Sequence, residues 1–396
     1  MKVLFLGFAL PNADFARFLE TDGGMPIQTQ RFGRSVIEAM ISADIRVTIV
    51  SAAPATDYPR NPRLVFRGYD FADGEVEGSA IPFVNVTGLK HITRYAAAWR
   101  GGQRAAKLVP PDAVVIHGVH SPFIWCGVHL GRRLGIPIVV ILTDPPSQAS
   151  SYDSRLSGAL KRVDRRLIVG GLRRVDGVIA LTASLAADFA PEARCLLMEG
   201  IAKRLDGGRG QRAATPAEPK RVVYAGGLLE GYGVLTLLRS VSLSKGDWRL
   251  YIYGRGPLES AVASTAASDP RVQFGGMANA SELASAYANA DLLVNPRPSS
   301  AEFTLHSFPS KLLEYLAAGR PVLSTRLPGI PPEYDRYVYW TDSDATSLAE
   351  SIDCILDQPR EVLAARGAAG MGFALSSRGP AAQGRRIHDF LTSLMR

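Results

Sequence analysis

Residues 308–325 (FPSKLLEYLAAGRPVLST) carry the side chains best suited to chemistry in this sequence. They predict a helix that begins at Pro309, because proline fits the first helical turn, and that ends at Gly319. Ser310 and Lys311 then lie in the first turn, where free backbone N–H groups attract an anion. A lysine there is poorly matched to the helix dipole, which makes a purely structural role less natural. The pattern favours a phosphate-binding helix N-terminus.

The sequence shows no pattern typical of glycosidase, metal-dependent or disulfide chemistry. No pair of carboxylates at glycosidase spacing is evident, and no cluster of His, Cys, Asp and Glu indicates a metal site. Cys126, Cys195 and Cys354 lie far apart, which argues against a disulfide framework and favours a reducing cytosol. The 45 Lys and Arg residues exceed the 37 Asp and Glu residues by 8, a balance that favours an anionic partner. No apolar run approaches the roughly 18 residues of a membrane-spanning helix.

The elements that must position these residues alternate between short β-branched runs and segments of helical period, such as 27–41. Buried parallel strands are expected at 3–8, 47–50, 114–116, 136–142 and 178–181. A second series is expected at 222–225, 250–253, 272–274, 292–294 and 322–324. This is the βαβ pattern of doubly wound α/β domains, which bind ligands beyond the carboxyl ends of their strands.

A break separates the two series. Residues 206–219 are rich in Gly, Arg, Ala and Pro and have no apolar period, so they predict a linker. We expect one α/β domain over residues 1–205, a second over residues 220–375, and a last helix within residues 376–396. Two such domains suggest that one binds a nucleotide while the other binds a second substrate.

The C-terminal half resembles the retaining nucleotide-sugar glycosyltransferases of family 4 (group 1). These enzymes have the GT-B fold, an α/β fold of two Rossmann-like domains facing across a cleft. The strongest match is residues 314–322 (EYLAAGRPV), which resemble the family's helix ending E-x-M-A-x-G-x-P-V. The resemblance implies that Glu314 accepts hydrogen bonds from the ribose of the donor nucleotide, since a carboxylate can receive two adjacent hydroxyls. The alternative is a solvated helix residue.

Further blocks extend the resemblance over about residues 222–339. YAGG resembles the glycine turn that opens the nucleotide domain, GRGP resembles its G-x-G-P turn, and ADLLVNP resembles the strand that leads into the donor site. The resemblance implies that Gly226, Gly227 and Gly254 bind the donor together with Glu314. From their positions, we expect Arg255, Ser310 and Lys311 to bind it as well. For GRGP alone, a plain tight turn is the alternative.

The N-terminal half matches more loosely. Gly23 and Gly24 resemble the family's glycine pair, where a missing Cβ lets backbone N–H groups approach the donor diphosphate; an ordinary surface turn is the alternative. The strand VVIHGVH resembles the one that ends in a sugar-contacting histidine. His117 and His120 compete for that role, with His117 favoured for its place at the strand end, although a structural histidine is the alternative. Asp144 follows the expected strand 136–142 and points into the crevice beyond the strand ends. It either has a substrate role there or caps a helix.

Three positions depart from the family pattern. The usual second carboxylate is replaced by His306, and the usual arginine and lysine near the first glycine turn are replaced by Gly227 and Tyr232. One alternative is an inactive member. We expect instead a subfamily variation in which Lys311 provides the missing charge and Glu302 the missing carboxylate.

Residues 155–174 interleave basic and apolar side chains. They can lie on an anionic membrane surface or face a phosphate-bearing acceptor, and the alternative is a surface helix that packs on the sheet. Aromatic residues are not interleaved there, so nucleic-acid binding is not expected.

The resemblance implies a hexosyltransferase of polysaccharide biosynthesis that moves a sugar from a nucleoside-diphosphate sugar to a hydroxyl of a saccharide, a lipid-linked intermediate or a small molecule. Retention, metal independence and a cytoplasmic location, with optional contact to the inner membrane face, are expected, and no cofactor beyond the donor substrate. The N-terminal domain would bind the acceptor, the C-terminal domain the donor, and the last helix would cross back. The alternatives are a nucleotide-sugar epimerase and a catalytically silent partner subunit.

Overall fold

The computed structural model describes residues 1–22, 24–146, 155–205, 218–299 and 302–395. By its internal contacts the chain divides into two compact units. Unit 1 comprises residues 1–201 together with 380–396, and unit 2 comprises residues 202–379. Gly23 and most of the expected linker, residues 206–217, lie outside the described residues.

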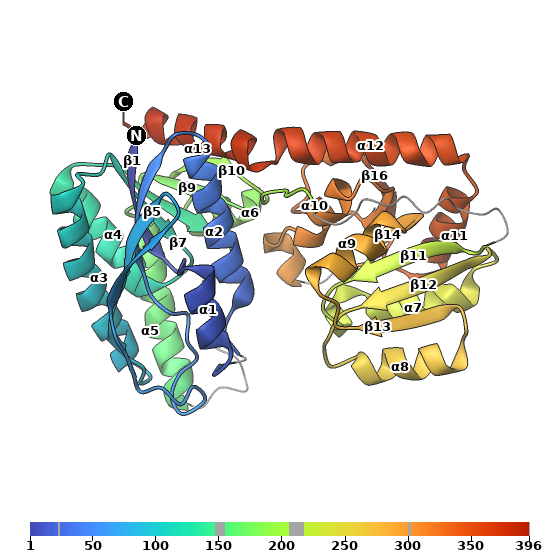
Figure 1. Cartoon of the computed structure of the whole chain (residues 1–396), viewed down its shortest axis with the longest axis horizontal. Helices are drawn as coiled ribbons and strands as arrows, with labels where there is room; N and C mark the ends of the chain where they lie inside the picture. Colours follow the sequence, from blue (N-terminus) through green and yellow to red (C-terminus); the bar gives the residue numbers. More distant parts are fainter. Residues whose placement is uncertain (23, 147–154, 206–217, 300–301, 396) are drawn as a thin grey trace. The chain divides into compact units, whose positions relative to one another are not determined.

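Unit 1 is built on an eight-stranded sheet (Figure 1) with the order β10-β9-β8-β7-β1-β2-β5-β4. Its strands are β1 (Lys2–Gly7), β2 (Arg46–Ser51), β4 (Tyr69–Asp73), β5 (Val76–Ala80), β7 (Ala113–His117), β8 (Ile138–Leu142), β9 (Gly177–Ala180) and β10 (Arg194–Leu197). All neighbours are parallel except β4 and β5, which form an antiparallel edge. Two further strands, β3 (Val65–Phe66) and β6 (Phe83–Val84), pair separately. The five strands expected here are confirmed, and β8 begins after Pro137, which has no N–H for the ladder.

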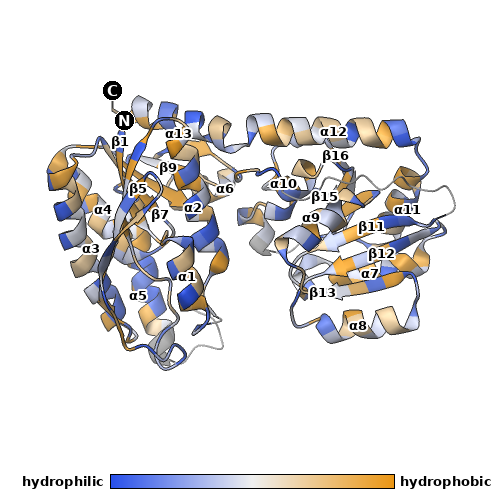
Figure 2. Ribbon diagram, in the orientation of Figure 1, coloured by the Kyte–Doolittle hydropathy of each residue, from blue (hydrophilic) through white to orange (hydrophobic). Residues whose placement is uncertain are grey.

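Helices cover both faces of this sheet. One face packs against α3 (Leu89–Leu108), α4 (Ser121–Leu134) and α5 (Arg155–Leu172), and the other against α2 (Ile27–Ile41) and α13 (Pro380–Leu394). The remaining helices are α1 (Asn12–Leu19) and α6 (Ala183–Phe189). Burial on both faces makes the central strands continuously apolar, as their orange colour in Figure 2 shows. The helix expected over 27–41 is confirmed.

Unit 2 repeats the architecture with six parallel strands in the order β13-β12-β11-β14-β15-β16. These are β11 (Lys220–Ala225), β12 (Trp248–Tyr253), β13 (Val272–Gly276), β14 (Leu292–Asn295), β15 (Val322–Thr325) and β16 (Val338–Thr341). One face packs against α7 (Val234–Leu243), α8 (Glu259–Ser268) and α11 (Ala345–Leu356), and the other against α9 (Ala280–Ala288), α10 (Ser310–Ala317) and α12 (Arg360–Ser377). Three 3-10 turns complete the unit: η1 (Glu230–Tyr232), η2 (Glu302–His306) and η3 (Pro332–Arg336).

The C-terminal segment consists of two helices that belong to different units. Helix α12 ends at Ser377 in unit 2, and α13 begins at Pro380 in unit 1. Gly384 of α13 lies so close to α2 that a Cβ would come within 2.0 Å of the Ala39 carbonyl oxygen. The helix therefore packs against α2 backbone to backbone. In the described part of the chain, no helix is long and apolar enough to cross a membrane, and no group of His, Cys, Asp and Glu could hold a metal ion.

Candidate functional site

The carboxyl ends of β1, β2, β7 and β8 surround an open pocket of about 390 Å³ in unit 1. Its lining includes Phe8, Thr56, Arg94, His120 and Asp144. This is the edge of a parallel sheet at which open α/β domains bind their ligands. Thr143 donates a hydrogen bond to Asp144 at 2.8 Å, and no described helix begins at Asp144. Asp144 therefore lines the pocket, and its role toward a substrate stays a prediction.

The two candidate histidines have different surroundings. His117 is fully buried, its ring packs against Gly33 and stacks on Phe5, and neither ring nitrogen has a hydrogen-bond partner among the described residues. Burial lowers the pKa of His117 to about 4. His120 lines the pocket, with its ring centroid 5.2 Å from that of Phe8. Of the two, the structure brings only His120 to the pocket, contrary to the preference for His117.

His120 is held as a neutral ring. Burial first, and then the charge of Arg94, keeps its pKa well below the usual value. The His120 Nε2 atom lies 3.4 Å from Nη1 of Arg94. A neutral imidazole can accept one hydrogen bond and donate another, which suits contact with sugar hydroxyls.

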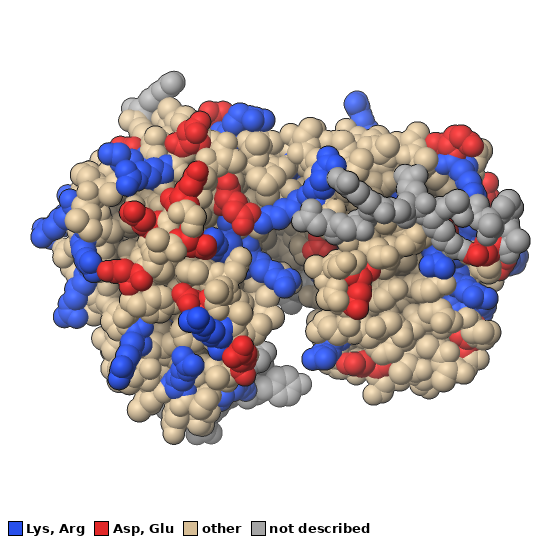
Figure 3. Space-filling model, viewed as in Figure 1, with Lys and Arg blue, Asp and Glu red and all other residues tan. Residues whose placement is uncertain are grey.

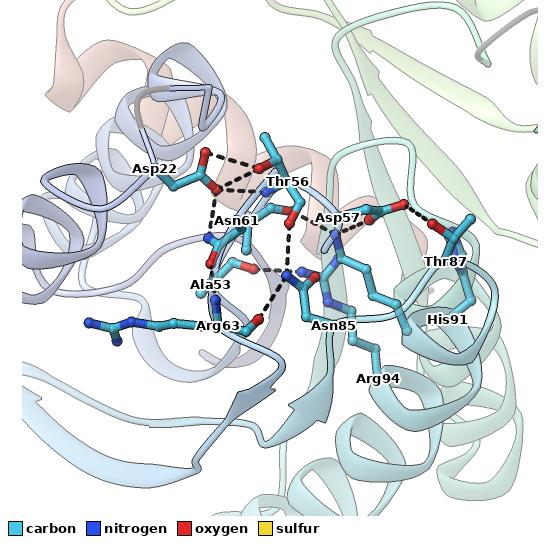
Figure 4. Close-up of polar contacts among 12 residues, drawn as sticks. Asp22, Ala53, Thr56, Asp57, Asn61, Arg63, Asn85, Thr87, His91 and Arg94 are labelled. Carbon is cyan, nitrogen blue, oxygen red and sulfur yellow. Dashed lines mark hydrogen bonds and ion pairs between the residues drawn. The ribbon is translucent and has the colours of Figure 1, made fainter. Parts of the chain in front are cut away.

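The buried carboxylate of Asp22 (Figure 4) holds Gly24, the one described member of the expected glycine pair. Asp22 accepts hydrogen bonds from the Thr56 N–H and the Asn61 amide, each at 2.8 Å, and from the Gly24 N–H at 3.2 Å. Burial raises the pKa of Asp22, but these hydrogen bonds outweigh burial and hold it below the usual value. Gly24 is thereby tied to the loop after β2, which lines the pocket.

Asp22→Asn is expected to destabilise the protein in a pH-dependent way. The folded-state pKa of Asp22 is depressed, so its stabilisation is complete above the unfolded pKa of about 4 and disappears as the pH falls through the folded value. The variant should lose about 1–3 kcal/mol at neutral pH, because one of the two carboxylate oxygens becomes an N–H₂ group that faces an N–H donor instead of accepting from it. Urea unfolding should show this gap closing in acid. Asp70→Asn, which breaks an exposed ion pair with Arg104, is the control. A gap that is independent of pH contradicts the assignment.

Two glycine turns meet at the carboxyl ends of β11 and β12 in unit 2. A Cβ on Gly254 would come within 1.9 Å of the Gly226 carbonyl oxygen, and a Cβ on Gly256 within 2.4 Å of that of Leu228. The Leu228 N–H also donates to the Arg255 carbonyl at 3.0 Å. This close approach requires the two glycines of GRGP and places Gly254 beside Gly226.

Hydrogen bonds from Tyr315 hold helix α10 against the end of β11, next to the same turns. The Tyr315 hydroxyl accepts from the Ala225 N–H at 2.8 Å and donates to the Ala225 carbonyl at 3.1 Å. On this helix Lys311 Nζ and Glu314 Oε2 form an ion pair at 2.6 Å, and both side chains are partly exposed. Ser310, at the first position of α10, is exposed. Lys311, Glu314 and the glycine turn after β11 thus occupy one end of the unit 2 sheet.

Two family models match the chain. Residues 219–358 match the model described as "Glycosyl transferases group 1", and residues 29–194 match the "Glycosyl transferase 4-like domain". The chain belongs to the group 1 glycosyltransferases. No curated protein matches the chain significantly.

Several solved structures have a similar fold. Sucrose-phosphate synthase from Thermosynechococcus elongatus is 15% identical, with a TM-score of 0.67 and coverage of 100% of this chain and 99% of that one. HepE from Anabaena in complex with UDP is 15% identical (TM-score 0.63; 99% and 100% covered). α,α-Trehalose 6-phosphate synthase from Burkholderia multivorans is 12% identical (TM-score 0.65; 100% and 98% covered). The expected GT-B fold is confirmed.

In this glycosyltransferase, one of the three positions that depart from the family pattern, Tyr232, has a cation from another segment beside it. The Arg297 guanidinium, from the segment after β14, lies 4.4 Å from the centre of the Tyr232 ring and donates to the Ser307 hydroxyl at 3.3 Å. A cation thus stands beside the position of the missing lysine. His306 ends η2 and is partly buried. The side chain of Glu302, the expected substitute carboxylate, lies outside the described residues.

A pair of buried cations beside the pocket of unit 1 was not predicted from the sequence. Lys90 and Arg94 lie one turn apart on α3, and both are buried. Lys90 pairs with Asp57 at 2.6 Å and donates to the Ala55 carbonyl at 2.6 Å. Figure 4 shows Asp57 with Thr87, which donates a hydrogen bond to it, and with Arg94 nearby. The one available signal was two basic residues on the sheet-facing side of a helix.

Proposed function

We propose that this glycosyltransferase moves a sugar from a nucleoside-diphosphate sugar, bound by unit 2, to a hydroxyl of an acceptor bound by unit 1. The observation that carries the proposal is the fastening of α10 to β11 through Tyr315, which gathers Lys311, Glu314 and the glycine turn after β11. The Glu314 carboxylate can accept hydrogen bonds from the ribose hydroxyls. Lys311, together with the N–H groups at the start of α10, can bind the diphosphate. The similar HepE structures were solved with UDP and with UDP-glucose, which supports this type of donor.

The proposed reaction retains the configuration of the transferred sugar. The acceptor hydroxyl attacks from the face of the leaving group, and the departing diphosphate takes the hydroxyl proton. This route needs no dedicated general base; it needs positioning and stabilisation of the leaving charge. Lys311 and Arg297 provide the positive charge, and neutral His120 contacts the sugar. The donor is a substrate, and the proposal includes neither a resident cofactor nor a metal ion.

Glu314→Ala is expected to weaken nucleoside diphosphate binding by about 1.5–3 kcal/mol, the range for hydrogen bonds to a charged group. Binding of the free nucleoside should weaken equally, because both ligands carry the ribose. Calorimetric titration of a panel of nucleoside diphosphates measures the effect. Glu361→Ala, an exposed glutamate in the first turn of α12, is the control. Unchanged affinity in Glu314→Ala would remove this residue from the donor site.

We also propose that α5 makes peripheral contact with an anionic membrane. Ile168 and Leu172 pack in the core, whereas Leu160, Val163 and Leu167 remain exposed among basic residues. Figure 3 shows basic and acidic side chains interspersed over one face of unit 1. Apolar burial together with attraction to anionic lipid is how such helices bind membranes.

Binding of the protein to vesicles of anionic lipid is expected to fall steeply as salt is raised, because surface charges are screened within about 8 Å at physiological ionic strength. Val163→Ser should weaken it further by removing exposed apolar area. Co-sedimentation measures both effects, with neutral vesicles as the control. Absence of binding at low salt would leave α5 as a surface helix.

A further inference from the structure

Arg94 is a buried cation in the wall of the unit 1 pocket. It is 3% exposed, and its guanidinium lies between the rings of Phe83, at 4.2 Å, and Phe8, at 5.4 Å. Its direct polar partners are both uncharged: Nη2 donates to the Ala53 carbonyl at 2.6 Å, and Nη1 lies 3.4 Å from Nε2 of His120. Its Nε–H has no partner among the described residues. Arg94 therefore lines the pocket with part of its hydrogen-bonding capacity unused.

The acidic groups nearby are engaged with other donors. Asp57 pairs with Lys90 at 2.6 Å, Asp22 accepts from Thr56, Asn61 and Gly24, and Asp144 on the pocket lining accepts from Thr143. No described carboxylate forms an ion pair with Arg94. A buried charge without a direct counter-ion is costly. Burial lowers the pKa of Arg94 to about 9, so the group is still a cation at neutral pH.

We propose that the pocket takes an acceptor that carries a phosphate or carboxylate group, and that Arg94 binds this group. The inference rests on the proposed function and specifies its acceptor. A guanidinium offers planar, charge-assisted hydrogen bonds that match both kinds of anion. The aromatic rings hold its plane fixed, so little side-chain freedom is lost on binding. His120, beside Arg94, then lies next to the bound anion.

The competing explanation is structural: Arg94 only holds the loop at Ala53. Arg94→Met separates the two, because methionine fills similar space between Phe8 and Phe83 but removes the charge. Arg94→Lys keeps the charge and removes the planar fork. Arg100→Met makes the same change at an exposed arginine of α3 and is the matched control.

The experiment titrates inorganic phosphate and, separately, acetate into the full chain. The donor site is first filled with the nucleoside diphosphate that binds best, so that it cannot take up the probe. Line broadening in ligand-observed NMR gives the affinity. Wild type and Arg100→Met are expected to bind at least one probe alike, and Arg94→Met about tenfold or more weaker, as for loss of a charge-assisted hydrogen bond. The probe that binds better identifies phosphate or carboxylate as the acceptor's group.

Two results would overturn the inference: no binding of either anion once the donor site is filled, or equal binding by wild type and Arg94→Met. If Arg94→Met does not fold, Arg94→Lys is expected to bind several-fold weaker than wild type, and equal binding there has the same meaning. Failure of every nucleoside diphosphate to bind is a separate result, which contradicts the proposed donor site. The anion titration without nucleotide then still tests Arg94.

Discussion

Lys311→Ala is expected to lower turnover by about 100- to 1,000-fold, the range seen when one group that stabilises developing charge is removed. The leaving diphosphate gains charge as its bond to the sugar breaks, and Lys311 lies in the first turn of α10, where N–H groups already favour an anion. Without ligand its ammonium pairs with Glu314 at 2.6 Å. Donor binding would place that ammonium between the carboxylate and the diphosphate. Lys311→Arg should retain part of the activity.

Binding measurements separate this role from a purely structural one. Lys311→Ala should weaken nucleoside diphosphate binding more than binding of the free nucleoside, because only the diphosphate meets the ammonium. Loss of the Glu314 ion pair alone would change both ligands alike. Lys245→Ala, at an exposed position between α7 and β12, is the control. Equal weakening of the two ligands, or none, would show that Lys311 does not hold the phosphates and would favour an inactive family member.

His120→Ala is expected to lower turnover by about 10- to 100-fold while nucleotide affinity stays within about twofold of wild type. The proposed sugar contact would be strongest in the transition state, whereas the proposed nucleotide site lies in unit 2. Initial rates and calorimetry on the same preparation provide the two numbers. A parallel loss of affinity and rate would indicate that the ring holds the whole donor.

His117→Ala is the matched comparison, since it removes the same side chain from a neighbouring buried position. It should leave a cavity between Phe5 and Phe32 and destabilise the fold by about 2–4 kcal/mol, without changing the turnover of folded molecules. Full activity in both variants would exclude a histidine at the sugar.

The alternation of elements could be predicted because both sheets are parallel and buried on both faces. Strands such as β7 and β8 are then continuous apolar runs, and helices such as α2 have one apolar face. The antiparallel pair of β4 and β5 was not expected. Its strands mix exposed and buried residues and contain Gly78, so their pattern is weak.

The two histidines show why site residues are harder to place than elements. In a sheet that is buried on both faces, the last residue of a strand can point into the core as easily as toward the ligand edge. Gly118, with φ of 87°, turns the chain directly after His117 and brings His120 to the pocket. A sequence gives no measure of that turn.

Cations from distant segments show the same limit. The pattern around Tyr232 reveals that the usual lysine is missing, but only the fold shows that Arg297 lies over that ring. Arg94 contacts Ala53 and His120 from separate elements, and in the sequence it is one more basic residue of a helix. The neighbours of such cations come from distant segments, so they can be identified only in the folded structure.

The most direct test of the central claim is the release of nucleoside diphosphate from a panel of nucleotide sugars, by wild type and by Lys311→Ala. Thermal unfolding of both proteins confirms that they are folded. We expect wild type to release nucleoside diphosphate from at least one nucleotide sugar, and to do so faster when an acceptor is present. Lys311→Ala should release it at a rate at least about 100-fold lower. A folded wild-type protein that neither binds nor cleaves any nucleotide sugar, or that returns an epimer without releasing nucleotide, would contradict the account.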